Sequence, residues 1–107
     1  ELEKALSIEA DHPLALSNLC GTLALQGADN ALDICEQALA ENPKDADVYN
    51  SIGILNGQGG QFDEAITAFL KAIDLEQEHN LAHNNLGRTY INMERFEDPT
   101  IRKEVPP

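Results

Sequence analysis

The chain is 107 residues long and carries a formal net charge of −12 at pH 7, a length that suits one domain. Binding to a phosphate backbone needs a basic surface, so this charge excludes nucleic acid as an expected partner. No apolar run is long enough to cross a bilayer, so no membrane contact is expected either.

The first segment, residues 1–12, is predicted to be the second helix of a helix pair whose first helix is absent. The chain begins without Met, so we expect it to be part of a longer array. The lack of a signal peptide then says nothing about the parent protein. We take a cytoplasmic location as the expectation.

Two helix pairs are predicted next, over 13–26 with 30–41 and over 45–56 with 63–75. In the second pair, apolar and small residues recur at steps of three and four, which marks one face of each helix. Gly53 lies on the facing side, so the helices can approach closely there. We expect Gly53→Leu to cost about 1–3 kcal/mol by overpacking, whereas Gly53→Ala should be mild because Ala favours a helix.

The rest of the chain is predicted to hold one more first helix over 80–96 and a divergent tail over 97–107. Asp98 could cap a short helix that begins at Pro99, since proline is tolerated at a first helical position. Alternatively, the tail is irregular. If no helix covers Leu86 and Tyr90, the exposed apolar surface favours self-association through the ends.

Internal repeats link these segments. The sequence HNNLGRTY at 83–90 repeats YNSIGILN at 49–56 with a shift of 34 residues, and Leu19-Cys20 precedes Ile52-Gly53 by 33. A period near 34 residues with two helices in each unit is typical of a helical solenoid.

The residues at these repeat positions resemble a known family. The tetratricopeptide repeat has the pattern W-x2-L-G-x2-Y, then A-x3-F, then P. The second unit gives Tyr49-x2-Ile52-Gly53 and then Ala65-x3-Phe69. The resemblance implies an all-α solenoid of about three repeats, each an antiparallel helix pair, within one domain over 1–107. The expected repeats are 13–45, 46–79 and the half repeat 80–96.

The two cysteines, Cys20 and Cys35, fall at core positions of the first helix pair. We expect two buried, reduced thiols. The alternative is a disulfide between the two helices, which requires Cα atoms less than about 7 Å apart. Neither a C-x-x-C motif nor a zinc-like spacing is present.

The sequence contains no pattern that predicts catalysis or metal binding. His79 should lie in the turn before a helix and His83 should point into the core, so with His12 they do not form a ligand set. The serines lack a G-x-S-x-G context, and the run at 57–60 lacks the lysine of a phosphate loop. We therefore expect no enzyme activity, no metal and no cofactor.

The first helix of each unit should turn one side toward an inner groove that is rich in amides. An Asn side chain carries both a donor and an acceptor, so a row of them can hold the backbone of an extended peptide. The alternative is that Asn18 and Asn85 only bond neighbouring backbone. The predicted groove residues are Ser17, Asn18, Asn50, Ser51, Ile54, Asn84, Asn85, Arg88, Ile91 and Asn92.

The family resemblance implies protein–protein interaction, with a peptide or a partner helix in the groove. Some tetratricopeptide domains hold acidic chaperone C-termini through basic side chains, but Arg88 is the only cation on this face. The asparagines are more similar to the ladder of O-linked N-acetylglucosamine transferase, which holds extended peptides. The alternatives are an assembly role by self-association through incomplete end repeats, or a substrate-recruiting segment of a larger enzyme.

Overall fold

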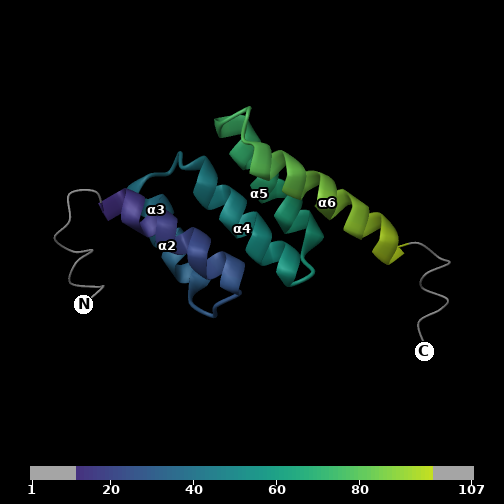
Figure 1. Ribbon diagram of the computed structural model, residues 1–107, viewed down its shortest axis with the longest axis horizontal. Helices are drawn as coiled ribbons and strands as arrows, with labels where there is room; N and C mark the ends of the chain where they lie inside the picture. Colours follow the sequence, from purple (N-terminus) through teal and green to yellow (C-terminus); the bar gives the residue numbers. More distant parts are fainter. Residues whose placement is uncertain (1–11, 98–107) are drawn as a thin grey trace.

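The computed structural model describes residues 12–97 as a row of α-helices without a β-strand (Figure 1). The helices are α2 (His12–Gln26), α3 (Ala31–Glu41), α4 (Ala46–Gln58), α5 (Phe62–Leu75) and α6 (Asn80–Glu97). The all-α prediction is confirmed, and the observed helix bounds lie within two residues of the predicted ones. The predictions for 1–12 and 97–107 lie outside the described residues, except that His12 begins α2 and Glu97 ends α6.

The helices pack as antiparallel pairs that stack on one another. Helix α2 pairs with α3 and α4 pairs with α5, while α4 also packs against both helices of the first pair. Helix α6 continues the row by packing against α5 and α4. The first helices α2, α4 and α6 therefore lie next to one another in chain order, which is the layering of a helical solenoid (Figure 1).

Local sequence fixes where these helices begin and end. Gly27 and Gly60 take positive φ values of 65° and 77° just after α2 and α4, a conformation that costs glycine least. In the second of these turns, the Gln61 N–H donates to the Asn56 carbonyl at 2.9 Å, which closes the helix end. Asp45 caps α4, because its Oδ1 accepts from the backbone N–H of Asp47 at 3.0 Å.

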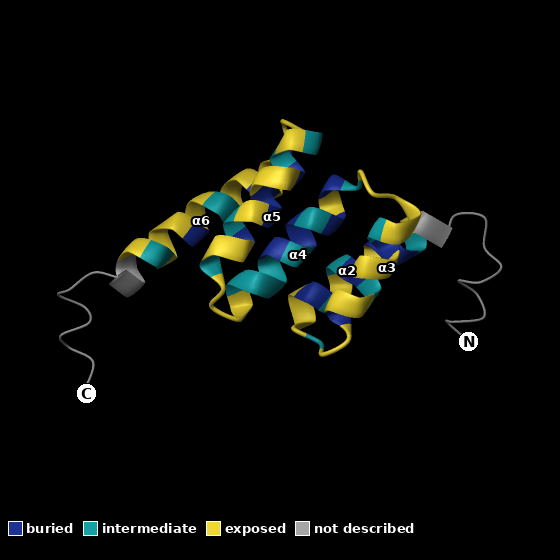
Figure 2. Ribbon diagram, turned by 180° about the vertical axis from the view of Figure 1, so that it is seen from behind, coloured by how far each residue is buried: buried dark blue, intermediate teal, exposed yellow. Residues whose placement is uncertain are grey.

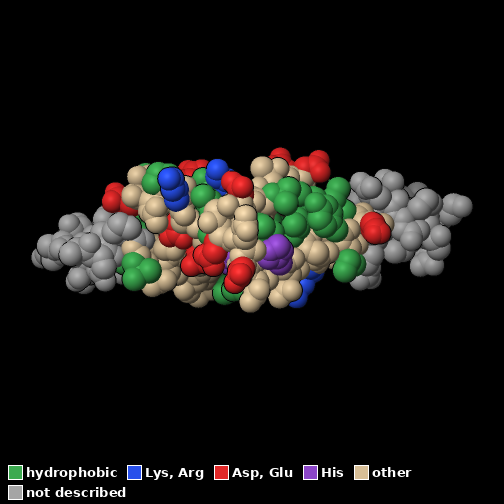
Figure 3. Space-filling model, turned by 90° about the horizontal axis from the view of Figure 1, so that it is seen from above, with side chains coloured by type: hydrophobic (Ala, Val, Ile, Leu, Met, Phe, Trp, Pro, Cys, Tyr) green, Lys and Arg blue, Asp and Glu red, His purple; other side chains and the backbone are tan. Residues whose placement is uncertain are grey.

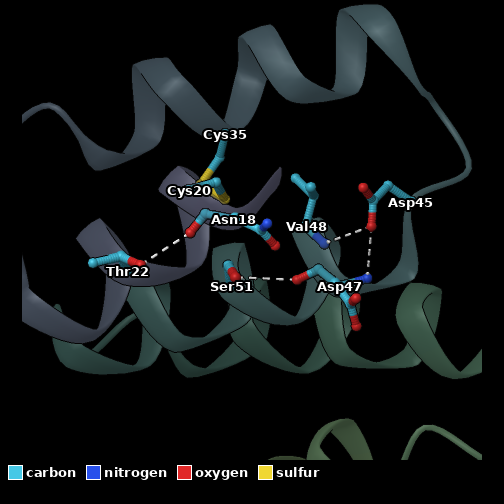
Figure 4. The surroundings of a disulfide bond; sticks show 8 residues. All are labelled: Asn18, Cys20, Thr22, Cys35, Asp45, Asp47, Val48 and Ser51. Atoms are coloured by element: carbon cyan, nitrogen blue, oxygen red, sulfur yellow. Dashed lines mark hydrogen bonds between the residues drawn. A yellow bond between two sulfur atoms is a disulfide. The ribbon is translucent and has the colours of Figure 1, made fainter. Parts of the chain in front are cut away.

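A disulfide joins α2 to α3 in the core of the first pair. Cys20 and Cys35 are both fully buried and bonded to each other, with Cα atoms 4.8 Å apart (Figure 4). The predicted burial is confirmed, but the predicted reduced thiols are wrong. The reason is that two small side chains face each other here, so the helices approach to a distance at which a disulfide forms.

In the second pair an aromatic ring occupies the place of that disulfide. Gly53 and Phe69 have the repeat positions of Cys20 and Cys35, and Phe69 is buried against the glycine. A Cβ added at Gly53 would lie 2.6 Å from Cδ1 and 2.7 Å from Cζ of the ring, far inside normal carbon contact. The structure contradicts the expectation that Gly53→Ala is mild, because the ring already fills that space.

The last helix leaves apolar side chains uncovered within the described part of the chain. Leu70 of α5 and Leu81, Tyr90 and Ile91 of α6 are all about half exposed or more. Figure 2 shows α6 with exposed residues along much of its length, and Figure 3 shows a hydrophobic patch toward this end of the molecule. Among residues 12–97, no helix combines the length and hydropathy needed to cross a membrane.

Candidate peptide-binding groove

A groove of about 530 Å³ runs across the three first helices α2, α4 and α6. Its polar lining is uncharged except for Asp47, and its apolar lining comes from Leu25, Ile54 and Leu81. Figure 4 shows Asn18 of α2 and Ser51 of α4 on adjacent helices of this groove. Six predicted residues line it, namely Ser17, Asn18, Asn50, Ser51, Ile54 and Asn85.

Two of these asparagines bond to each other across neighbouring repeats. The Asn85 Nδ2 donates to the Asn50 Oδ1 at 3.1 Å, and Asn50 is only 6% exposed. No buried side-chain nitrogen or oxygen in the described chain lacks a partner. Since the Asn50 Nδ2 and the Asn85 Oδ1 have no partner in this part of the chain, these two atoms must be accessible from the groove. The pair offers a donor from Asn50 and an acceptor from Asn85, which is what a peptide unit requires.

The alternative prediction was that Asn18 and Asn85 bond only to nearby backbone. It is wrong for Asn85, which donates to the side chain of Asn50. The hydroxyls of the groove do bond locally instead. Ser51 Oγ donates to the Asp47 carbonyl at 3.1 Å, and Thr22 Oγ1 donates to the Asn18 carbonyl at 3.0 Å (Figure 4). Thr22 was not predicted to line the groove. Its spacing of four residues from Asn18 places both on one helix face and could have indicated it.

The single carboxylate of the groove belongs to an inter-repeat contact with His79. The His79 Nε2 lies 2.6 Å from the Asp47 Oδ1, while its Nδ1 accepts from the Ala82 N–H at 3.1 Å. Because Nδ1 is an acceptor here, the ring proton sits on Nε2 and is donated to Asp47. His79 thus caps α6 and ties it to the start of α4. Its predicted place in the turn is confirmed.

A smaller cavity of about 240 Å³ extends the groove between α4 and α6. Arg88 and Asn92 line it together with Ile54 and Asn85, which belong to both cavities. The predicted set is therefore divided between two adjoining hollows, with the guanidinium in the smaller one.

Two predicted groove residues, Asn84 and Ile91, line neither cavity and are exposed on α6. Asn84 has the repeat position of Asn50, but Asn50 is enclosed because α6 packs beside α4. The described residues place no further first helix beside α6 to enclose Asn84. The predicted burial of His83 is also wrong, since the residue is exposed and its Nε2 lies 2.8 Å from the Gln77 carbonyl.

Two family profiles match the part of the chain in which the repeats were found. A family profile described as "Tetratricopeptide repeat" matches residues 34–67, and a second, described as "TPR repeat", matches residues 57–93. This chain is a tetratricopeptide-repeat protein. Repeats of this family generally mediate protein–protein interaction.

The chain is also similar, over part of its length, to a protein of the fruit fly. Over 55 residues, the chain is 34% identical to the protein O-mannosyl-transferase Tmtc3 of Drosophila melanogaster. The aligned residues make up 51% of this chain but only 6% of that relative. No solved structure matches the chain. Within the described residues, no three His, Cys, Asp or Glu side chains are grouped as metal ligands.

Proposed function

We propose that this chain is a non-catalytic protein–protein interaction module that binds an extended peptide in the groove. The observation that carries the proposal is the hydrogen bond between Asn50 and Asn85. That bond fixes two amides side by side and leaves the Asn50 NH₂ group as a donor and the Asn85 carbonyl oxygen as an acceptor. A peptide backbone presents the complementary acceptor and donor at every residue.

The rest of the lining supports a partner that is apolar and not acidic. Leu25, Ile54 and Leu81 provide apolar surface for alternate side chains of an extended chain. The groove itself contains no cation, and Arg88 lies in the adjoining cavity. An acidic tail would bury carboxylates without a counter-charge and would face Asp47.

Binding of labelled peptides to two single variants tests this proposal. Asn50→Ala should weaken a bound peptide by about 0.5–1.5 kcal/mol for each hydrogen bond lost. Asn84→Ala is the matched control, because it makes the same change at the same repeat position outside both cavities. The sequence predicts both Asn50 and Asn84 in the groove, whereas this proposal gives only Asn50 a role in binding.

Fluorescence anisotropy with a peptide library would give the dissociation constants, and thermal melting would establish that each variant is folded. If Asn84→Ala weakened binding as much as Asn50→Ala, the peptide would lie outside the groove. If neither variant changed the affinity, the amide pair would play no part.

A second candidate function is the recruitment of protein substrates to a larger enzyme. It rests on the similarity to a protein O-mannosyl-transferase and uses the same groove. In the parent protein, replacing Asn50 and Asn85 by Ala should lower activity on whole protein acceptors but not on a short acceptor peptide. Equal effects on the two acceptors would contradict recruitment through the groove.

Self-association through the last helix is a third candidate, favoured by the exposure of Leu81, Tyr90 and Ile91 at 63%, 47% and 59%. Exposed apolar side chains of this kind can provide a contact between two copies of the chain. Sedimentation at several protein concentrations would show a rising mass if the chains associate. Tyr90→Glu should then restore the monomer, and a monomer at high concentration without any substitution would remove this candidate.

A further inference from the structure

A third hollow, which we call the outer cleft, lies between α4 and α5 and has a volume of about 540 Å³. Its floor comes from Tyr49 and Ile52 of α4 and from Ala68 of α5. At about 3.6 residues per turn, these α4 positions lie on the side of the helix opposite to Asn50 and Ile54. The outer cleft shares no residue with the groove or with the smaller cavity.

One residue in the wall of the outer cleft differs in size from its equivalents in the other repeats. Asn56 lines it, at the repeat position that Leu23 holds in the first unit and Tyr90 in the third. A short amide therefore stands where the other units carry a large side chain. The Asn56 side chain makes no hydrogen bond within the described residues, so its amide is available to a ligand. The Asn56 amide is thus one of the polar groups in the wall of a hollow whose floor is apolar.

Charged groups of opposite sign border the two ends of the outer cleft. Asp63 and Glu64, both exposed, come from the first turn of α5. Lys71 lies eight residues after Asp63, roughly 12 Å at the rise of an α-helix, with its Nζ 5.9 Å from the centre of the Tyr49 ring. The ring already engages the ammonium group, whereas among the described residues no cation lies within ion-pair distance of Asp63 or Glu64.

We propose that the outer cleft binds a basic segment of a protein partner through one large apolar side chain. The apolar floor accepts the side chain, the Asn56 amide bonds the backbone beside it, and the two carboxylates attract a basic residue nearby. The net charge of −12 favours the approach of such a segment from a distance. In an extended segment, the basic residue would stand two positions from the apolar one, because alternate side chains share a face.

A panel of labelled nine-residue peptides would serve as the probe, with Leu, Phe or Trp at the centre and Arg two residues to either side. Matched peptides would carry Glu in place of Arg, or Ser in place of the central residue. Binding of the full chain would be followed by fluorescence anisotropy. Two-dimensional ¹⁵N NMR would show which amide signals shift, so the outer cleft is distinguished from the groove.

Three variants test separately the contributions of the apolar hollow and of its carboxylates. Asn56→Tyr fills the outer cleft with the residue found in the third unit, and should abolish binding without touching the groove. Glu64→Lys should weaken binding about three- to tenfold, as expected for a reversed exposed charge pair. Glu36→Lys is its control, since it makes the same change at an exposed carboxylate of α3 outside the outer cleft, and should leave the affinity within twofold or so.

The expected result is that the Arg-flanked peptides shift the signals of Asn56, Thr67 and Ala68. Raising NaCl from about 50 mM to about 500 mM should weaken this binding, because screening shortens the reach of the carboxylates. The proposal is overturned if no peptide of the panel binds, if the shifts map to Asn50 and Asn85, or if the Asn56→Tyr variant binds as tightly as the unsubstituted chain. Circular dichroism of each variant shows that the helices are retained.

Discussion

The contact between Gly53 and Phe69 allows a sharp test of how the helix pairs pack. An added Cβ at Gly53 would lie 2.6 Å from Cδ1 and 2.7 Å from Cζ of the Phe69 ring. The ring is 2% exposed, so it cannot swing into solvent without opening the core. Gly87 has the same repeat position in α6, and an added Cβ there meets nothing within 4 Å.

The two glycines therefore form a matched pair for substitution by Ala. In both, Ala should gain up to about 1 kcal/mol over Gly from helix propensity alone. At Gly53 this gain is opposed by overpacking, which costs about 1–3 kcal/mol. We expect Gly87→Ala to stabilise the chain and Gly53→Ala to destabilise it, with a difference of about 1–3 kcal/mol that measures displacement of the ring.

Urea unfolding gives the free energy of each variant, provided that the m-value stays constant. Phe69→Leu in the Gly53→Ala background should recover part of the loss, so that the double variant is less damaged than the sum of the two single ones. If Gly53→Ala stabilised the chain as much as Gly87→Ala does, the close approach of α4 and α5 would be wrong.

Three further predictions concern the disulfide, a helix cap and the groove. Replacing Cys20 and Cys35 together by Ser should lower the free energy of unfolding by about 3 kcal/mol, the value for a loop of about 15 residues, and should make stability insensitive to dithiothreitol. Asp45→Ala should cost about 0.5–2 kcal/mol in urea unfolding while Asp45→Asn costs less, because Asn also caps a helix; equal losses would contradict the cap. Peptide affinity in the groove should change little between low and physiological salt, and a steep salt dependence in anisotropy would instead indicate the carboxylates of the outer face.

Most of the fold could be predicted because its determinants are local in sequence. The Asp45 cap and the turn at Gly60 act within a few residues, and the register of 33 to 34 residues then repeats them along the chain. The same register correctly placed Cys20 and Cys35 in the core of the first helix pair. It could not establish their bond, because that depends on a helix separation that only packing determines.

The groove could be predicted in outline but not in detail. Register treats Asn50 and Asn84 as equivalent, yet only Asn50 has a following first helix beside it in the described chain. The contact between His79 and Asp47 also escaped prediction, since it joins residues 32 positions apart. Such pairs depend on how one repeat is set against the next, and no pattern within a single repeat contains that information.

The amide pair of the groove can be observed directly, because Asn side-chain NH₂ groups give their own signals in ¹⁵N NMR spectra. A peptide from the library that binds the chain would be titrated in, and the signals of Asn50, Asn84, Asn85 and Asn56 followed. Binding in the groove predicts that the NH₂ signals of Asn50 and Asn85 shift while those of Asn84 and Asn56 stay in place. A titration that left the Asn50 and Asn85 signals unmoved at saturation would contradict the proposed function.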